Sequence, residues 1–261
     1  MHYCIGDIHN DHKRFSQMLK LLNLRPEDHV YLLGDLFDRN LAEPDPVGVY
    51  FTMLKLGERC TVIRGNHDQW LAEYILRYYN TPEKKRKKLW PYPYNSFDLM
   101  VQRLTPVDML HLAELILQWP LQAELEVGGE KYLLAHAQTF LPDPKESPCG
   151  SKKICITKEN RQYKWENEIQ RSVRQNTDTP AEKESIDNVK PEDYLMGNFG
   201  YDDFLKQGVD GYISVCGHND TGNGKIWKND RNNVYVCDCG CGFADGRMGC
   251  LCLETKEEFY V

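Results

Sequence analysis

The sequence predicts an α/β fold in which parallel strands alternate with helices. Three short apolar runs, at residues 2–6, 29–33 and 60–64, lead into polar blocks that begin at Gly6, Gly34 and Gly65. After each polar block, apolar side chains recur at helical spacing, over residues 15–22, 47–56 and 69–79. Successive units of strand, loop and helix place their strands side by side and parallel.

The second half of the chain predicts different elements. Residues 107–119 have a helical apolar pattern that Pro120 stops, and Gly128-Gly129 then predicts the turn of a hairpin. The predicted strands of this half are residues 123–127, 131–135 and 212–216, followed by two strands within residues 234–253 that a glycine-rich turn joins.

Length and composition predict one domain over residues 1–261, because 261 residues with 41% hydrophobic content can bury a large core. The polar segment at about residues 141–200 is interpreted as a surface excursion, with a helix around 158–174. No basic leader or long apolar stretch is visible, and the ten cysteines do not require disulfides in a chain of this size. We therefore expect a cytoplasmic protein with no membrane partner and an unknown oligomeric state.

The net charge of −7 argues against a partner such as duplex nucleic acid, which is bound mainly through Lys and Arg. The one basic run, Lys84 to Lys88, is interpreted as a solvated helix end or loop, with a docking patch for an acidic partner as the alternative. The alternating cysteines of the tail favour small buried thiols over a zinc site, because their spacing is not that of a zinc ribbon: Cys237, Cys239, Cys241, Cys250 and Cys252.

The polar blocks after the strands supply candidate metal ligands. Ligands gather beyond the carboxyl ends of strands in open α/β sheets, so these side chains are expected to meet. Asp7 and His9 are two residues apart, and an extended backbone would point both side chains the same way. Asp35 can bridge two ions, and the second ion is completed by Asn66, His136 and His218. Each residue alone has an ordinary structural interpretation, as a turn, cap or core histidine, so the prediction rests on the set.

The mixed nitrogen and oxygen ligands predict two divalent metal ions, with Mn favoured and Fe or Zn as alternatives. Two such ions bridged by a hydroxide lower the pKa of water and stabilise in-line displacement at phosphorus. His67 is the candidate general acid, and Asp38 can accept from its other ring nitrogen. Arg39 offers a fork for phosphoryl oxygens, with a local Asp38–Arg39 ion pair as the alternative. Arg39 and Asn66 are thus the expected substrate-binding residues, whereas His2, His12, His29 and His111 match no such pattern.

These motifs together resemble the calcineurin-like metallophosphoesterases, and most closely their phosphoprotein phosphatase branch. The resemblance rests on Gly-Asp-x-His at residue 6, Gly-Asp-x-x-Asp-Arg at 34, Gly-Asn-His-Asp at 65, a lone His136 and Gly217-His218. It implies two mixed β-sheets packed as a sandwich flanked by helices, in four layers. It also implies that Asp7, His9 and Asp35 hold one ion, and that Asp35, Asn66, His136 and His218 hold the other.

The chain departs from the family pattern at Asn10 and Asn40, where glycine is usual, and at Asp68, where eukaryotic members have Glu. A divergent, bacterial-type member is therefore expected. The family's second phosphate-binding arginine has three candidates here, Arg161, Arg171 and Arg174, and no motif selects one.

The leading functional hypothesis is hydrolysis of phosphate monoesters, namely phosphoserine and phosphothreonine in proteins. The alternative is hydrolysis of symmetrical dinucleoside tetraphosphates, because the same chemistry serves both and only the shape of the pocket decides. A non-catalytic scaffold is disfavoured, since His67 and Asp35 are both retained.

Overall fold

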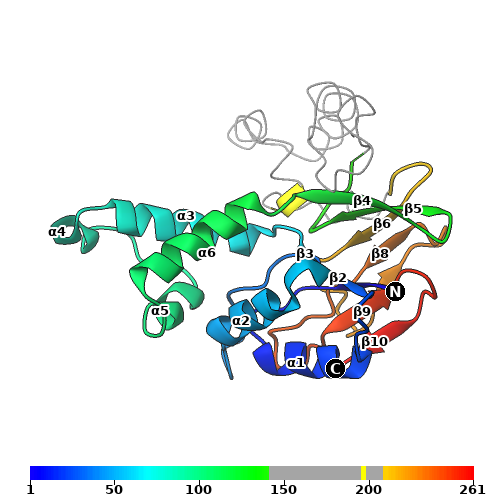
Figure 1. The fold of residues 1–261 in the computed structure, drawn as a ribbon, viewed down its shortest axis with the longest axis horizontal. Coiled ribbons are helices and arrows are strands. Elements are labelled where there is room, and N and C mark those ends of the chain that lie inside the picture. The colour runs from blue at the N-terminus through cyan, green and yellow to red at the C-terminus, as the bar shows by residue number, and fades with distance from the viewer. Residues whose placement is uncertain (141–194, 198–207) are drawn as a thin grey trace, which may run out of the picture.

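Two mixed sheets of five strands each pack face to face, with helices on the outer face of the first sheet (Figure 1). This computed structural model describes residues 1–140, 195–197 and 208–261. The predicted excursion at 141–200, apart from 195–197, and the predicted helix at 158–174 lie outside the described residues. Within that described part, no helix is both long enough and apolar enough to cross a bilayer.

The first sheet has the strand order β10-β9-β1-β2-β3. The strands β1, β2 and β3 are parallel, as predicted, whereas β9 pairs antiparallel with β1 and β10 pairs antiparallel with β9. The bounds are β1 His2–Ile5, β2 His29–Leu32, β3 Cys60–Val62, β9 Gly249–Cys252 and β10 Glu258–Tyr260.

The second sheet has the order β4-β5-β6-β8-β7. The predicted hairpin is present as β4 and β5, and β5, β6 and β8 run parallel. The bounds are β4 Gln122–Val127, β5 Glu130–Ala135, β6 Ile213–Cys216, β7 Trp227–Lys228 and β8 Val234–Val236. Gly128 and Gly129 both have positive φ, which a tight hairpin turn requires.

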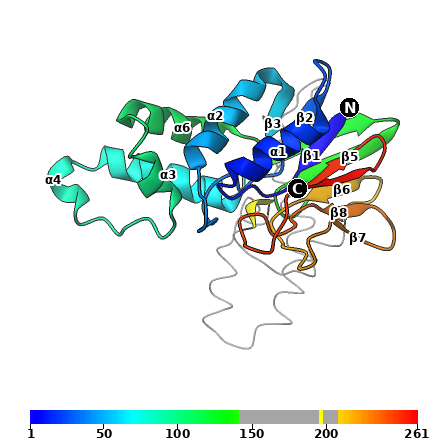
Figure 2. The same ribbon diagram turned by 90° about the horizontal axis from the view of Figure 1, so that it is seen from below.

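Helices α1 and α2 cover the first sheet, whereas α3 to α6 extend to one side of both sheets in both views (Figure 2). The bounds are α1 His12–Leu22, α2 Pro46–Leu56, the 3₁₀ turn Gly57–Arg59, α3 Asn66–Asn80, α4 Glu83–Arg86, α5 Ser96–Met100 and α6 Pro106–Gln118. Pro at the start of α2 and α6 suits the first turn of a helix, where the missing N–H has no partner to lose. Most of the basic run lies on α4 or just after it and is exposed, as predicted.

Two apolar cores result from the alternation of side chains along the strands. Ile5 and Leu32 point toward the helices, and Cys4 and Leu33 point toward the second sheet. This alternation anchors the ends of β1 and β2 from both sides, so the loops that follow them start from fixed positions.

The two strands predicted within residues 234–253 are present as β8 and β9, but they are not adjacent and a tight turn does not join them. β8 pairs with β6 in the second sheet, and β9 pairs with β1 in the first. The glycine-rich segment between them therefore crosses from one sheet to the other. The cysteines are buried thiols, as predicted, although they are spread over both cores rather than along adjacent strands.

Candidate metal centre

Polar residues from both sheets meet at the carboxyl ends of the strands. Asp7 follows β1, Asp35 follows β2, His136 follows β5 and His218 follows β6. Asn66 is the first residue of α3, so the helix predicted over residues 69–79 is present but begins three residues earlier than expected. The helix starts early because Asp68, two residues into it, accepts the backbone N–H of Gly65.

The first group of candidate ligands consists of Asp7, His9 and Asp35, whose donor atoms lie within 4.8 Å of one another. His9 Nε2 is 3.5 Å from Asp7 Oδ2 and 3.8 Å from Asp35 Oδ2. His9 Nδ1 is 3.0 Å from the carbonyl oxygen of Phe37, to which it must donate. Nε2 therefore carries the free lone pair and points at the two carboxylates.

The second group consists of Asp35, His136 and His218. His136 Nε2 is 3.4 Å from Asp35 Oδ1 and 3.2 Å from His218 Nδ1. The amide oxygen of Asn66 lies 3.1 Å from the same Nε2. His136 Nδ1 donates to the carbonyl oxygen of Leu33 at 2.7 Å, so its Nε2 is again directed into the group. Asp35 belongs to both groups.

The residues present fit a pair of divalent cations. Asp7 Oδ2 and His9 Nε2 are buried without a hydrogen-bond partner among the described residues, a costly arrangement that a bound cation would relieve. Two glycines leave room for the ligands, because a Cβ at Gly65 would lie 2.2 Å from Asp35 Oδ1 and one at Gly217 would lie 2.3 Å from Asp7 Oδ1. Mixed imidazole and carboxylate donors suit Mn, Fe or Zn.

Electrostatic coupling holds Asp35 and His218 in the forms that bind metal, whereas His136 would have to release a proton to a bound cation. Burial alone would raise the pKa of Asp35, but the imidazoles of His136 and His67 outweigh it and hold the pKa well below its usual range. For His136, burial lowers the pKa, but the carboxylates of Asp35 and Asp7 outweigh burial and raise the pKa to about 10, so this imidazole is protonated at pH 7 when no cation is bound. Burial and the neighbouring His136 lower the pKa of His218 to about 4, so its imidazole is neutral at pH 7.

Several residues in the loops that carry these side chains adopt the left-handed backbone conformation, with positive φ. His9 has φ 48° and Asp35 has φ 48°, so the expected extended backbone from Asp7 to His9 is wrong, although the two side chains do converge. Asn10 and Asn40 have φ 61° and 39°, which explains how they replace glycine, since Asn enters this region more readily than most residues. Each such conformation costs about 1–3 kcal/mol and persists only where surrounding contacts impose it.

His67 and Asp38 are hydrogen-bonded beside the two groups. His67 Nδ1 lies 3.0 Å from Asp38 Oδ2, and both side chains are buried. The backbone N–H of His67 donates to Asp35 Oδ1 at 3.0 Å, which ties the histidine to the residue that both groups share. The rings of Trp70 and Tyr94 lie 4.8 Å and 4.5 Å from the imidazole and fix its plane.

Arg39 extends from the same loop as Asp38 and is half-buried. Its carbonyl oxygen accepts from Asn95 Nδ2 at 2.6 Å, and its guanidinium lies 5.4 Å from the centre of the Phe243 ring. Within the described part of the chain, no carboxylate pairs with this guanidinium, so the alternative of a local Asp38–Arg39 ion pair finds no support there.

Several residues that position this centre were not predicted. Asp68 accepts the backbone N–H groups of Asp35, Leu36 and Gly65, and burial next to Asp35 raises its pKa to about 7. Tyr92 donates its hydroxyl to Asp38 Oδ2 at 2.5 Å. Asp68 was visible in the sequence as the third residue after Gly65, which is the position of a capping carboxylate. Tyr92 has no comparable local signal.

The start of α5 and the end of β8 add two more buried residues. Ser96 accepts the backbone N–H of Asp38 at 2.6 Å and donates to Asn10 Oδ1 at 3.1 Å, so it joins the first two loops. Burial and the nearby Asp7 carboxylate raise the pKa of Asp238 to about 8. Asp238 follows a buried strand at the same edge as the candidate ligands, which is the signal that could have found it.

The remaining predicted residues lie elsewhere. His12 contacts Asp45 and Thr52, His29 contacts Thr61, and His2 contacts Glu254, while His111 is exposed on α6. The three candidates for a second phosphate-binding arginine, Arg161, Arg171 and Arg174, lie outside the described residues.

Comparison with known proteins agrees with this geometry. Residues 3–239 match the family model for calcineurin-like phosphoesterases. A protein of Nitrosomonas europaea named "Bis(5'-nucleosyl)-tetraphosphatase, symmetrical" is 34% identical over 67 residues, 25% of this chain and 24% of that protein. A protein of Wigglesworthia glossinidia brevipalpis with the same name is 27% identical over 166 residues, 62% of this chain and 54% of that protein. These matches therefore span from a quarter to about half of the relatives' length.

A solved structure described as a putative diadenosine tetraphosphatase is also similar in fold. It aligns with a TM-score of 0.53 at 17% identity, over 100% of this chain and 92% of that chain. At this identity the likeness establishes the fold alone, and it agrees with the two-sheet sandwich.

Proposed function

We propose, from the premise that this chain belongs to the calcineurin-like phosphoesterase family, that it hydrolyses symmetrical dinucleoside tetraphosphates into two nucleoside diphosphates. The observation that carries the chemistry is the pair of ligand groups that share Asp35, with the hydrogen-bonded His67 and Asp38 beside them. Metal dependence through a manganese pair and a cytoplasmic location belong to the same proposal.

The choice of substrate is supported by the curated relatives, each named as a symmetrical tetraphosphatase. The aligned parts cover only a fraction of those proteins. For this reason their activity suggests a substrate for this chain, and the experiment below tests that substrate directly. Hydrolysis of phosphoserine and phosphothreonine, the leading hypothesis from the sequence, has no comparable support, and it becomes the competing outcome of the experiment below.

The candidate ligands divide the proposed ions between them. Asp7, His9 and Asp35 would hold one ion, and Asp35, Asn66, His136 and His218 the other. A pair of divalent cations there would supply an activated water and neutralise the negative charge of the phosphate chain. The protein contributes a rigid, buried frame, because each candidate ligand is fixed by a backbone hydrogen bond or by a neighbouring ligand.

His67, Asp38 and Arg39 have separate roles in this proposal. Since Asp38 engages Nδ1, the Nε2 atom of His67 is the one that can deliver a proton to the leaving oxygen. Asp38 orients the ring by accepting a hydrogen bond from its other nitrogen. The guanidinium of Arg39 is suited to two phosphoryl oxygens, which it can bind as a fork.

The experiment is a comparison of two substrates with the full chain and Mn²⁺. Turnover of diadenosine tetraphosphate and of a phosphoserine peptide is measured as kcat/KM, and the nucleotide products are separated by chromatography. We expect a preference for the dinucleotide of at least about 10²-fold, since a matched pocket discriminates by a few kcal/mol. ADP should be the sole nucleotide product, and in ¹⁸O-labelled water one of the two ADP molecules should carry the label.

Two results would contradict the proposal. Production of ATP and AMP would mean that the chain cuts the wrong bond of the tetraphosphate, and a preference for the phosphopeptide would restore the phosphoprotein hypothesis. Absence of turnover on both substrates, with two equivalents of metal bound, would favour the scaffold.

A further inference from the structure

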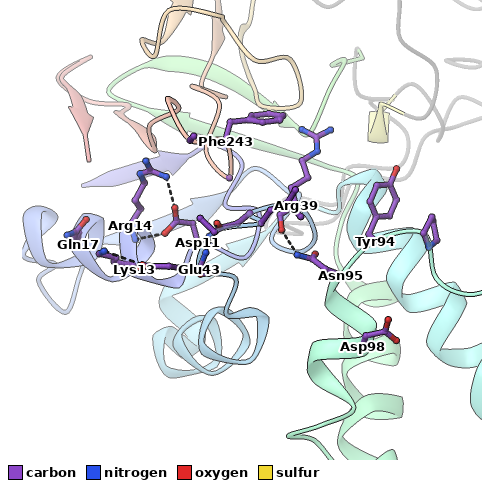
Figure 3. A pocket seen from close by; sticks show the side chains of 16 residues that line it. Asp11, Lys13, Arg14, Gln17, Arg39, Glu43, Tyr94, Asn95, Asp98 and Phe243 are labelled. Carbon is purple, nitrogen blue, oxygen red and sulfur yellow. Dashed lines mark hydrogen bonds and ion pairs between the residues drawn. The ribbon is translucent and has the colours of Figure 1, made fainter.

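A large pocket lies directly beside the metal centre. It has a volume of about 930 Å³ and is lined by the first half of α1, the loop after β2, the segment at the start of α5 and the loop after β8 (Figure 3). Tyr94 lines this pocket and packs against the imidazole of His67, and Arg39, which also lines it, follows the Asp38 that binds His67. A pocket of this size can hold a nucleotide rather than a lone phosphate group.

The cations of this pocket are not equivalent. Arg14 is paired with Asp11 at 2.7 Å, and Lys13 is paired with Glu43 at 3.2 Å. Arg39 has no such carboxylate partner within the described residues, and in Figure 3 its side chain rises toward Phe243. It is therefore the cation of the pocket that is available to an anionic ligand.

Phe243 is an exposed aromatic residue at the rim of the large pocket. The side chain is 48% exposed, and the neighbouring Leu41 is 88% exposed, so the pocket rim carries two large apolar groups in contact with water. A Cβ at the preceding Gly242 would lie 2.6 Å from the Cβ of His9, a candidate metal ligand. The loop is thus packed against the metal centre, and the ring is held near it.

Arg39 and Phe243 also line a second cavity. It has a volume of about 310 Å³, and the candidate ligand His218 lines it too. Arg39 and Phe243 are therefore shared by the larger pocket and by a cavity that reaches the metal centre. A ligand that carries both a phosphate chain and an aromatic group could contact the metal centre and Arg39 through its phosphates and Phe243 through its aromatic group.

We propose that Phe243 is a stacking platform for the nucleobase of a nucleoside polyphosphate in the large pocket, with Arg39 on its phosphate chain. This inference rests on the proposed function and adds to it the residue that recognises the base. Base stacking on an aromatic side chain is tolerant of sequence, so the site would accept purine and pyrimidine nucleotides alike.

The test compares a ligand that has a base with one that lacks it. Dissociation constants of ADP and of inorganic pyrophosphate are measured by calorimetry on the full chain with Mn²⁺, for the wild type, Phe243→Ala and Phe243→Leu. Stacking contributes about 1–3 kcal/mol per base, so the advantage of ADP over pyrophosphate should fall by about fivefold or more in both variants. Because the ratio of the two ligands is compared, any effect of the substitution on Arg39 or of free Mn²⁺ on the ligands cancels.

Phe51→Ala is the matched control, because Phe51 is 47% exposed on α2 and lines neither of the two cavities. This variant should keep the wild-type ratio. The inference is overturned if wild-type protein binds ADP no more tightly than pyrophosphate, if Phe243→Ala weakens both ligands equally, or if Phe243→Leu retains the full advantage of ADP. The protein could fail to hydrolyse diadenosine tetraphosphate while the ratio of the ADP and pyrophosphate dissociation constants still depends on Phe243. That result would support the base site and contradict the proposed function alone.

Discussion

Asp38 Oδ2 receives two buried donors, His67 Nδ1 at 3.0 Å and the hydroxyl of Tyr92 at 2.5 Å. The carboxylate thus orients the imidazole and is itself oriented by a residue from a distant segment. Such a chain of hydrogen bonds fixes which nitrogen of His67 can face a substrate. Changes to His67 or Tyr92 should therefore affect proton transfer to the leaving group.

Replacement of His67 by Asn should lower kcat, and the loss should be larger for substrates with poorer leaving groups. An alkoxide leaving group needs a proton, whereas a diphosphate or an activated aryloxide leaves as a stable anion. We expect a loss of about 10² to 10⁴-fold in kcat for a phosphoserine peptide, and a smaller loss for diadenosine tetraphosphate and an aryl phosphate. Steady-state kinetics on the three substrates, with bound metal quantified, measures this difference. Equal losses on all three would count against protonation of the leaving oxygen.

Tyr92→Phe should also lower kcat more for poor leaving groups than for good ones, but by a smaller factor than His67→Asn. The variant keeps the ring and removes one donor to Asp38, so Tyr92 acts as a positioning residue. We expect a stability loss of about 1–2 kcal/mol in urea unfolding and a fall in kcat that is larger for poor leaving groups. A purely structural role would lower turnover of all substrates alike and would refute the positioning role.

Asp35→Asn should empty the metal centre while leaving the fold intact. Asp35 is the residue that both ligand groups share, and the amide keeps its size but loses the charge that offsets two cations. Metal analysis after dialysis should find about two ions per chain in the wild type and fewer than about one in the variant. Asp45→Asn, which changes a carboxylate outside both groups, should retain the wild-type metal content. Full metal occupancy in Asp35→Asn would contradict the assignment of Asp35 as a shared ligand.

Much of the metal centre could be predicted because strand ends are visible in the sequence. Asp7, Asp35 and His136 each follow a short apolar run, and parallel strands bring such positions to one edge. The left-handed turn at His9 was not predictable, since it is imposed by backbone hydrogen bonds from His9 and Asn10 to the loop after β2. Those contacts join residues far apart in the chain.

The support around Asp38 escaped prediction for the same reason. Tyr92 and Ser96 act through single contacts with the loop after β2, and α5 is too short to leave a periodic pattern. The placement of β8 and β9 in different sheets was likewise invisible, because a glycine-rich connection does not reveal whether its strands pair. The single-domain interpretation of residues 1–261 stays a prediction.

The last prediction concerns the start of α2 and its dependence on pH. Asp45 accepts the backbone N–H of Gly48 at 2.9 Å and pairs with Arg103 at 2.5 Å and with His12 at 3.2 Å. Burial opposes ionisation, but these partners outweigh it and lower the pKa of Asp45 below 3.8. Because the folded pKa lies below the unfolded one, ionised Asp45 stabilises the fold above about pH 4, and this contribution disappears as the pH falls through the folded pKa.

Asp45→Asn should therefore lower the free energy of unfolding by about 0.5–1 kcal/mol at pH 7, a modest value because the side chain is partly exposed. The difference from the wild type should shrink steadily between pH 4 and the folded pKa, a range set by the depressed value below 3.8. Urea unfolding at a series of pH values measures it, with Glu58→Gln, an exposed carboxylate in the turn after α2, as the control that should change stability by less than about 0.5 kcal/mol. A difference that stays constant down to pH 3 would contradict a role for the ionised carboxylate. No difference at pH 7 would mean that the hydrogen bond to Gly48 is the whole contribution, since Asn can cap a helix but cannot pair with Arg103 through charge.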